Sequence, residues 1–131
     1  MKNKKKSKTI IGILGLGYVG LPLAVEFSLF FPVLGFDTNR KRVKDLKKGI
    51  DQTDQISKEK LAASNALELT HDKQDLKSAN IFIITVPTPV DKNNKPNLKP
   101  LMDASGIVGK LIKKGSIIIF ESTVFPGCTE Q

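Results

Sequence analysis

The chain has 131 residues and a mass of 14.4 kDa, which is the size of a single domain. Hydrophobic residues make up 40% of it and charged residues 26%, which excludes a wholly disordered chain. No apolar run approaches the ~18 residues of a membrane helix, and glycines interrupt the apolar segment behind the N-terminal lysines, which argues against a secretory signal. Because one cysteine cannot form an internal disulfide, we expect a cytoplasmic setting.

The formal net charge of +8 would ordinarily suggest a nucleic-acid or membrane partner, but its distribution argues against both. Residues 1–8 contain no acid and five lysines, Lys2, Lys4, Lys5, Lys6 and Lys8. Without this segment the charges are nearly balanced, and the segment has no aromatic residue on which a base could stack. We therefore expect residues 1–8 to be a disordered basic tail and predict no nucleic-acid or membrane partner.

Short apolar segments alternate with helical patterns along the rest of the chain. The segments expected to be strands are residues 9–14, 33–36, 67–70, 81–86 and 116–121. The segments expected to be helical are residues 21–31, 39–48, 57–63, 72–78 and 100–112, with Asn39 and Ser57 as N-caps.

This alternation predicts an α/β fold with a parallel sheet and right-handed crossovers. We expect a Rossmann-like, doubly wound sheet of about five strands in the order 3-2-1-4-5, with helices on both faces. No linker rich in proline, glycine or serine divides the chain, so residues 9–131 are expected to form one domain.

The segment Gly15-Leu16-Gly17-Tyr18-Val19-Gly20 fits the pattern G-x-G-x-x-G. It gains meaning because it follows a predicted strand and opens a predicted helix. Gly15 permits a tight turn, Gly17 lets the backbone approach a pyrophosphate, and Gly20 lets helix and strand pack closely. The free N–H groups at the start of the helix would then bind the phosphates of a dinucleotide.

Asp37 lies 22 positions after Gly15, at the end of the second predicted strand. The dinucleotide-binding pattern needs an acid about 20 residues after the glycines, because its carboxylate accepts hydrogen bonds from the adenosine ribose hydroxyls. The same charge repels a 2′-phosphate, which favours NAD over NADP as cofactor. Arg40 and Arg42 weaken that inference, since an arginine can bind a 2′-phosphate; a solvated helix face is the alternative for both.

Three motifs together resemble one enzyme family. The sequences I-G-I-L-G-L-G-Y-V-G-L-P-L-A, T-V-P-T-P and E-S-T-V-F-P-G, spread over residues 9–131, are similar to those of the UDP-glucose, UDP-N-acetylhexosamine and GDP-mannose dehydrogenases. The proline-rich T-V-P-T-P-V and the E-S-T-V-F-P-G motif look most like the branch that oxidises UDP-N-acetylhexosamines. The resemblance implies oxidation of the sugar C6 hydroxyl to a carboxylate with two NAD, for the synthesis of surface polysaccharide precursors.

The resemblance also implies roles for individual residues. Tyr18 and Val19 would place backbone N–H groups at the pyrophosphate, and Asp37 and Arg42 would bind the adenosine ribose. Thr88 would lie near the second ribose. Thr123 would bind the cofactor and, as the one candidate for a catalytic role, position water and the nicotinamide. Physical reasoning supports the two threonines, because ligands of open α/β sheets bind beyond the carboxyl ends of the strands.

The family's catalytic cysteine belongs to a later glycine-rich segment, so the resemblance implies that Cys128 is not the nucleophile. His71, in a polar stretch, is expected to be a surface residue, and we predict no metal site. The family's central helix and its UDP-sugar-binding domain are expected to be absent from this chain. We therefore expect the chain to bind NAD without oxidising sugar, and a UDP-sugar to bind only with the missing half. The full-length enzyme is expected to be a homodimer, and this chain a monomer or weak self-associate.

Two other interpretations remain open. The first is the Rossmann domain of a hydroxyacid dehydrogenase of the 3-hydroxyisobutyrate or 6-phosphogluconate type, against which Tyr18, Val19 and the E-S-T-V-F-P-G motif argue. The second is a non-catalytic module that senses NAD.

Overall fold

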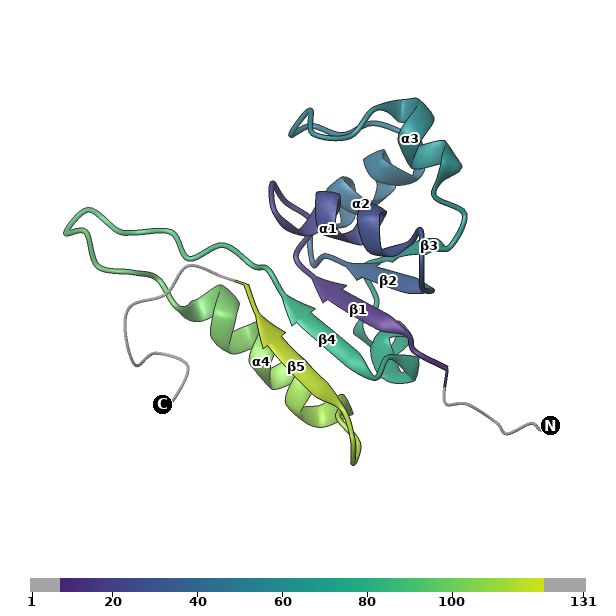
Figure 1. Cartoon of the computed structure of the whole chain (residues 1–131). Coiled ribbons are helices and arrows are strands. Elements are labelled where there is room, and N and C mark those ends of the chain that lie inside the picture. Colours follow the sequence, from purple (N-terminus) through teal and green to yellow (C-terminus); the bar gives the residue numbers. More distant parts are fainter. Residues whose placement is uncertain (1–7, 122–131) are drawn as a thin grey trace.

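The computed structural model describes residues 8–121, in which five strands form one parallel sheet in the order β3-β2-β1-β4-β5 (Figure 1). The predicted fold class and strand order are thereby confirmed. The strands are β1 (Ile11–Leu14), β2 (Val33–Phe36), β3 (Leu67–Thr70), β4 (Ile81–Ile84) and β5 (Ile117–Phe120).

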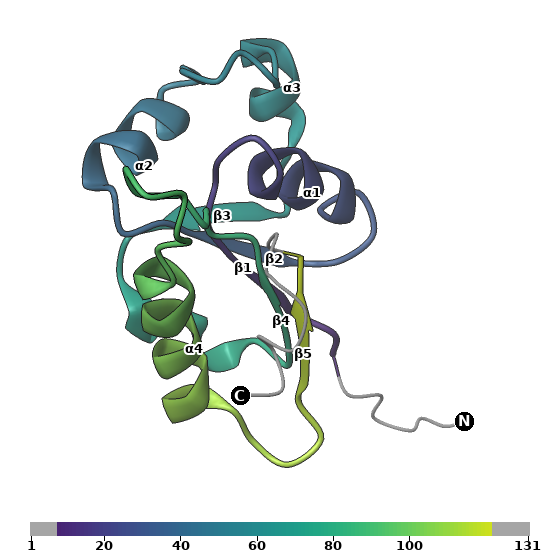
Figure 2. The ribbon, with the colours of Figure 1, turned by 90° about the vertical axis from the view of Figure 1, so that its left-hand side faces the viewer.

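Helices cover both faces of the sheet, as Figure 2 shows with α1 and α2 above it and α4 below. The helical elements are α1 (Gly20–Phe27), α2 (Arg40–Lys47), α3 (Lys58–Ala63), the 3-10 helix η1 (Lys73–Ser78) and α4 (Lys99–Leu111). Two apolar clusters fill the layers. One packs α1 and Leu46 of α2 against the sheet, and the other packs Leu76 of η1 and the buried face of α4 against the opposite side.

The central strand β1 is buried along its whole length because its apolar side chains meet a helical layer on each face. Its last residue, Leu14, is in register with Phe36 of β2 and Ile84 of β4. The segments that follow these strands therefore begin at the same end of the sheet, where the carboxyl ends of the strands lie. This register brings the glycine-rich turn, Asp37 and the segment after β4 together.

The predicted helix starts agree with side-chain caps in the structure. The Asn39 side chain accepts a hydrogen bond from the N–H of Arg42, and the Ser57 side chain accepts one from the N–H of Lys60. At the start of η1, Asp72 accepts one from the N–H of Gln74. These caps satisfy N–H groups that have no partner within their own helix.

The first helix is shorter than the predicted range of residues 21–31. It ends at Phe27, where Ser28 Oγ donates to the carbonyl of Val25 and the N–H of Phe30 to that of Phe27, before Pro32. Three apolar side chains that the sequence had placed in the helix are exposed as a result, Leu29, Phe30 and Phe31. The predicted strands at residues 81–86 and 116–121 are shorter too, and the side chains of β5 are exposed at the sheet edge.

Candidate functional site

A cleft of about 780 Å³ lies beyond the carboxyl ends of the strands. One wall is the glycine-rich turn between β1 and α1, together with Asp37 at the end of β2. The other wall consists of the segment after β4 and the first turns of α4. This is where the sheet order changes direction around β1, the place at which open α/β sheets bind ligands. Its volume is in the range of small-molecule and cofactor sites.

The glycine-rich turn is folded tightly against the sheet. Gly15 has a φ of +104°, which favours glycine, and its N–H donates to the carbonyl of Phe36 at 2.8 Å. A Cβ on Gly20 would overlap the carbonyl oxygen of Gly15 and Oγ1 of Thr85. Thr85 Oγ1 itself donates to the carbonyl of Gly15 at 2.7 Å. The close packing predicted for Gly15 and Gly20 is therefore present.

Gly17, in the middle of the turn, has free space beside it, whereas Gly15 and Gly20 at the ends of the turn are tightly packed. A Cβ on Gly17 would meet no atom within 4 Å, although Gly17 lines the cleft. The next two residues also line the cleft, and their exposed fractions are 69% for Tyr18 and 51% for Val19. Val19 gives α1 no side-chain cap. The backbone N–H groups of this open part of the turn, directly before α1, thus lie at an exposed surface that fits the pyrophosphate of a dinucleotide.

Asp37 faces the turn from the end of β2. One carboxylate oxygen accepts from the N–H of Leu16 and the other from the N–H of Asn39, both at 2.9 Å. Asp37 also lines the cleft, so it joins the turn to the start of α2 while keeping its negative charge at the site. The structure thus brings the acid and the glycines together as the spacing predicted.

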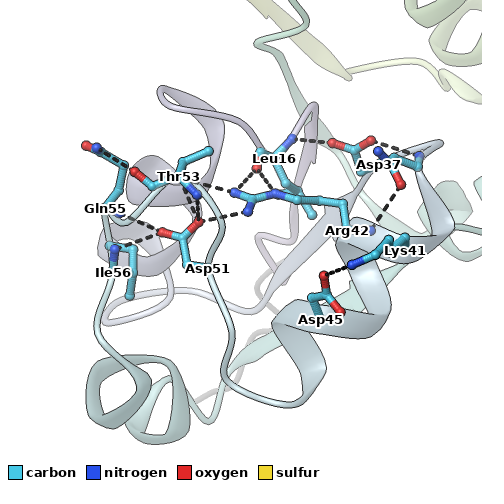
Figure 3. A network of polar contacts seen from close by, with 10 residues as sticks. Leu16, Asp37, Lys41, Arg42, Asp45, Asp51, Thr53, Gln55 and Ile56 are labelled. Atoms are coloured by element: carbon cyan, nitrogen blue, oxygen red, sulfur yellow. Dashed lines mark hydrogen bonds and ion pairs between the residues drawn. The ribbon is translucent and has the colours of Figure 1, made fainter.

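Arg42 forms a buried network under the turn (Figure 3). Its Nε and Nη2 donate to the carbonyl of Leu16 at 2.8 and 2.6 Å, and its Nη1 donates to Asp51 Oδ1 at 2.8 Å. Only 9% of the Arg42 side chain and 1% of the Asp51 side chain are exposed. The solvated helix face considered for Arg42 is therefore wrong, because its guanidinium reaches the glycine-rich turn. Arg40, by contrast, is exposed.

Asp51 is a member of this network that sequence reasoning missed. Burial alone would raise the pKa of its carboxyl group, but hydrogen bonds from Thr53, Arg42 and the N–H groups of Ile56 and Gln55 lower that pKa far below its ordinary value. The one local feature that could have indicated its role was the spacing of Asp51 and Thr53, because Asp side chains often bond the backbone N–H two residues on, as in an Asx turn. Thr85 was also missed, although a lone hydroxyl in an apolar run needs a buried partner.

The remaining candidates divide between described and undescribed residues. Thr88 is half-buried and lines the cleft, as does the exposed Glu121, whose N–H donates to the carbonyl of Ile84. His71 is exposed, as predicted. Thr123, Cys128 and most of the basic tail lie outside the described residues. Within residues 8–121 no group of histidine, cysteine and acidic side chains could hold a metal ion, and no helix is long and apolar enough to cross a membrane.

Comparison with known proteins decides the family. Residues 9–131 match the model of the UDP-glucose/GDP-mannose dehydrogenase family, NAD binding domain. The chain belongs to this family. It contains the NAD-binding domain, and its cofactor is NAD, as the sequence predicted.

The relatives also support the predicted branch. The chain is 50% identical over 121 residues to a UDP-N-acetyl-D-glucosamine 6-dehydrogenase of Pseudomonas aeruginosa, which covers 92% of this chain and 29% of the relative. It is 37% identical over 127 residues to a UDP-N-acetyl-D-mannosamine dehydrogenase of Pyrococcus horikoshii, with coverage of 92% and 30%. The chain thus spans about three tenths of the length of the relatives it matches.

Solved structures show the same relationship. The UDP-D-ManNAc dehydrogenase of Pyrococcus horikoshii superposes with a TM-score of 0.87 at 34% identity, over 93% of this chain and 30% of that one. GDP-mannose dehydrogenase of Pseudomonas aeruginosa gives a TM-score of 0.82 at 26% identity, over 92% and 30%. A glycerol-3-phosphate dehydrogenase of Coxiella burnetii, at 19% identity, shares the fold alone.

Proposed function

We propose that this chain is the NAD-binding part of an oxidoreductase that converts the C6 hydroxyl of a UDP-N-acetylhexosamine into a carboxylate, using two NAD. The reaction would supply uronate precursors of surface polysaccharides in the cytoplasm. Relatives named for UDP-N-acetylglucosamine and UDP-N-acetylmannosamine support this substrate class. The observation that carries the binding role is the open space at Gly17 beside the uncapped start of α1.

The described residues suggest how the cofactor would be held. The backbone N–H groups of Gly17, Tyr18, Val19 and Gly20, just before and at the first residue of α1, would bind the pyrophosphate. Gly15, whose N–H donates to Phe36, would shape the turn that presents them. The chemistry that NAD would supply when bound is uptake of the hydride removed from the sugar carbon. The Asp37 carboxylate would accept hydrogen bonds from the adenosine ribose, to which the family resemblance also assigns Arg42.

The second wall of the cleft would complete the site. Thr88 can donate and accept hydrogen bonds near the second ribose, from a loop made rigid by Pro87 and Pro89. Thr123, which lies outside the described residues, is proposed to order water and the nicotinamide. Sugar oxidation itself would need residues beyond this chain, so we expect the chain alone to bind NAD without turning over sugar. We propose a homodimer for the full-length enzyme.

Titration calorimetry of the 131-residue chain with NAD, NADP and UDP-N-acetylglucosamine tests this proposal. We expect NAD to bind, NADP to bind more weakly because Asp37 repels its 2′-phosphate, and the sugar nucleotide not to bind. Tighter binding of NADP would show that Arg40 and Arg42 outweigh Asp37. NADH production from the purified chain with UDP-sugars would contradict the proposal that this chain binds NAD without oxidising the sugar.

A matched pair of glycine variants tests the site itself. Gly17→Ala fills the space that the backbone of the turn leaves for the pyrophosphate, so we expect NAD affinity to fall by about tenfold or more. Its free energy of unfolding should stay within about 0.5 kcal/mol of the original, because the new methyl group meets no protein atom. Gly109→Ala, on the exposed side of α4, is the control and should leave NAD binding unchanged.

A further inference from the structure

The peptide groups of Leu16 are held from two sides. Its N–H donates to Asp37 at 2.9 Å, and its carbonyl accepts two hydrogen bonds from Arg42. Leu16 directly precedes Gly17, the residue whose open space marks the candidate pyrophosphate site. Because a peptide unit is planar, fixing the carbonyl of Leu16 also fixes the N–H of Gly17.

Arg42 is in turn held by Asp51. The guanidinium of Arg42 has five N–H groups in one plane, so a partner for Nη1 sets the direction of Nε and Nη2 as well. That partner is Asp51 Oδ1, at 2.8 Å and nearly completely buried. Because the ion pair is shielded from solvent, salt screens it less than a surface pair, and removing one partner would leave a buried charge unpaired.

The position of Asp51 is set by its own loop, residues 51–56. Oδ1 also accepts from the N–H and hydroxyl of Thr53, and Oδ2 accepts from the N–H groups of Gln55 and Ile56. Figure 3 shows these contacts converging on one carboxylate opposite Arg42. The loop thus presents a fixed anion, and Arg42 relays its position to the glycine-rich turn.

We propose that Asp51 is a positioning residue for the cofactor, which acts through Arg42 to hold the Leu16 carbonyl so that the N–H groups of the turn face the pyrophosphate. This inference rests on the proposed NAD-binding function. It also limits what Arg42 offers a ligand, because its charge is neutralised by Asp51 and its Nε, Nη1 and Nη2 donate within the protein. Arg42 held in this way is a poor partner for a 2′-phosphate, which leaves Asp37 to favour NAD.

A double-mutant cycle tests whether Asp51 acts through Arg42. Asp51→Asn keeps the shape of the side chain but turns an amide N–H toward groups that are themselves donors. We expect it to weaken NAD binding by about tenfold, the value of one charge-assisted hydrogen bond. Arg42→Gln should weaken it at least as much. The two effects should not add, so Asp51→Asn should have little further effect in the Arg42→Gln background.

The control is Asp54→Asn, an exposed position in the same loop with a φ of 58°, which asparagine tolerates. It should leave NAD affinity unchanged. Amide NMR spectra without ligand add a second measurement. If Asp51 stabilised only its own loop, its substitution would not shift the amide resonances of the glycine-rich turn. Asp51→Asn should shift the Leu16 and Gly17 resonances as well as those of residues 51–56, whereas Asp54→Asn should shift only its own neighbours.

The outcomes separate this inference from the proposed function. If the unmodified chain binds no NAD, the proposed function fails. If it binds NAD but Asp51→Asn changes neither the affinity nor the Gly17 resonance, or if the effects of the two substitutions add fully, the inference fails. Should Asp51→Asn not fold, Arg42→Lys provides the test, because it keeps a charge beside Asp51 but cannot supply the two hydrogen bonds to Leu16. Unchanged NAD affinity in Arg42→Lys would overturn the inference.

Discussion

The two walls of the cleft are held in different ways. The glycine-rich turn is fixed by side chains distant in the sequence, since Asp37 binds the N–H of Leu16 and Thr85 binds the carbonyl of Gly15. In the segment after β4, Asp91 instead accepts from the N–H groups of Asn93 and Lys95, inside its own loop. Thr85 begins the segment after β4, so the two walls are bonded to each other at that point. The contrast lies further along the segment, because residues 91–95 are held by local turn chemistry while the glycine-rich turn is fixed by contacts across the fold. The first wall should therefore dictate how a ligand is oriented.

The largest effect on the free energy of unfolding is expected from disrupting the packing of the glycine-rich turn at Gly20. Because its new Cβ would overlap the Gly15 carbonyl and Thr85, Gly20→Ala should lower the free energy of unfolding by about 3 kcal/mol in urea denaturation. Gly109→Ala adds the same methyl group to an open part of α4 and should be neutral or stabilising by up to about 1 kcal/mol. Equal stability of Gly20→Ala and the original chain would show that the turn is not rigidly packed.

A smaller effect on the free energy of unfolding is expected from acid, which protonates the Asp51 carboxylate beneath the glycine-rich turn. The pKa of Asp51 is lowered from its ordinary value of 3.8 by its hydrogen bonds, so the unfolded chain binds more protons there than the folded one. This contribution to stability is present above pH 3.8 and is lost as the pH falls below it. In urea denaturation from pH 6 to pH 2, Asp51→Asn should lose less stability than the original chain.

Asp54→Asn is the control, because it changes an exposed side chain of the same loop and leaves the hydrogen bonds of the Asp51 carboxylate in place. Asp45, whose pKa is lowered chiefly by a hydrogen bond from Lys41, is unaltered in both variants. Its contribution therefore cancels in the comparison. Parallel pH profiles for Asp51→Asn and the original chain would contradict the assigned hydrogen bonds.

The smallest effect is expected at the second wall. Lys99 and Asp103 form an exposed i,i+4 ion pair at the start of α4, with a distance of 3.0 Å between Nζ and Oδ2. Exposed pairs of this kind contribute little, so Asp103→Asn should change the free energy of unfolding by less than about 0.5 kcal/mol, and added salt should remove the difference. A loss above 1 kcal/mol would mean that the second wall is as tightly held as the first.

The same contrast explains what the sequence could predict. The strands, their order and the positions of Gly15, Gly17 and Asp37 follow from patterns that are local or have a fixed spacing. The roles of Asp51 and Thr85 could not be predicted, because each depends on a contact between segments that meet only in the folded chain. The C-terminal end of α1 was placed too late because the apolar residues after Phe27 continue a helical pattern that the turn before Pro32 interrupts.

The position of β1 in the sheet has a consequence for how the chain folds during synthesis. β1 pairs with β2 on one side and β4 on the other, and its register with β4 joins Ile11 to Ile81. At translation rates of ~5–20 residues per second, the β4-facing edge of β1 would wait several seconds for its partner on the ribosome. During that interval an apolar strand presents unpaired N–H and carbonyl groups, which makes the nascent chain a target for chaperones before it can become an NAD-binding domain.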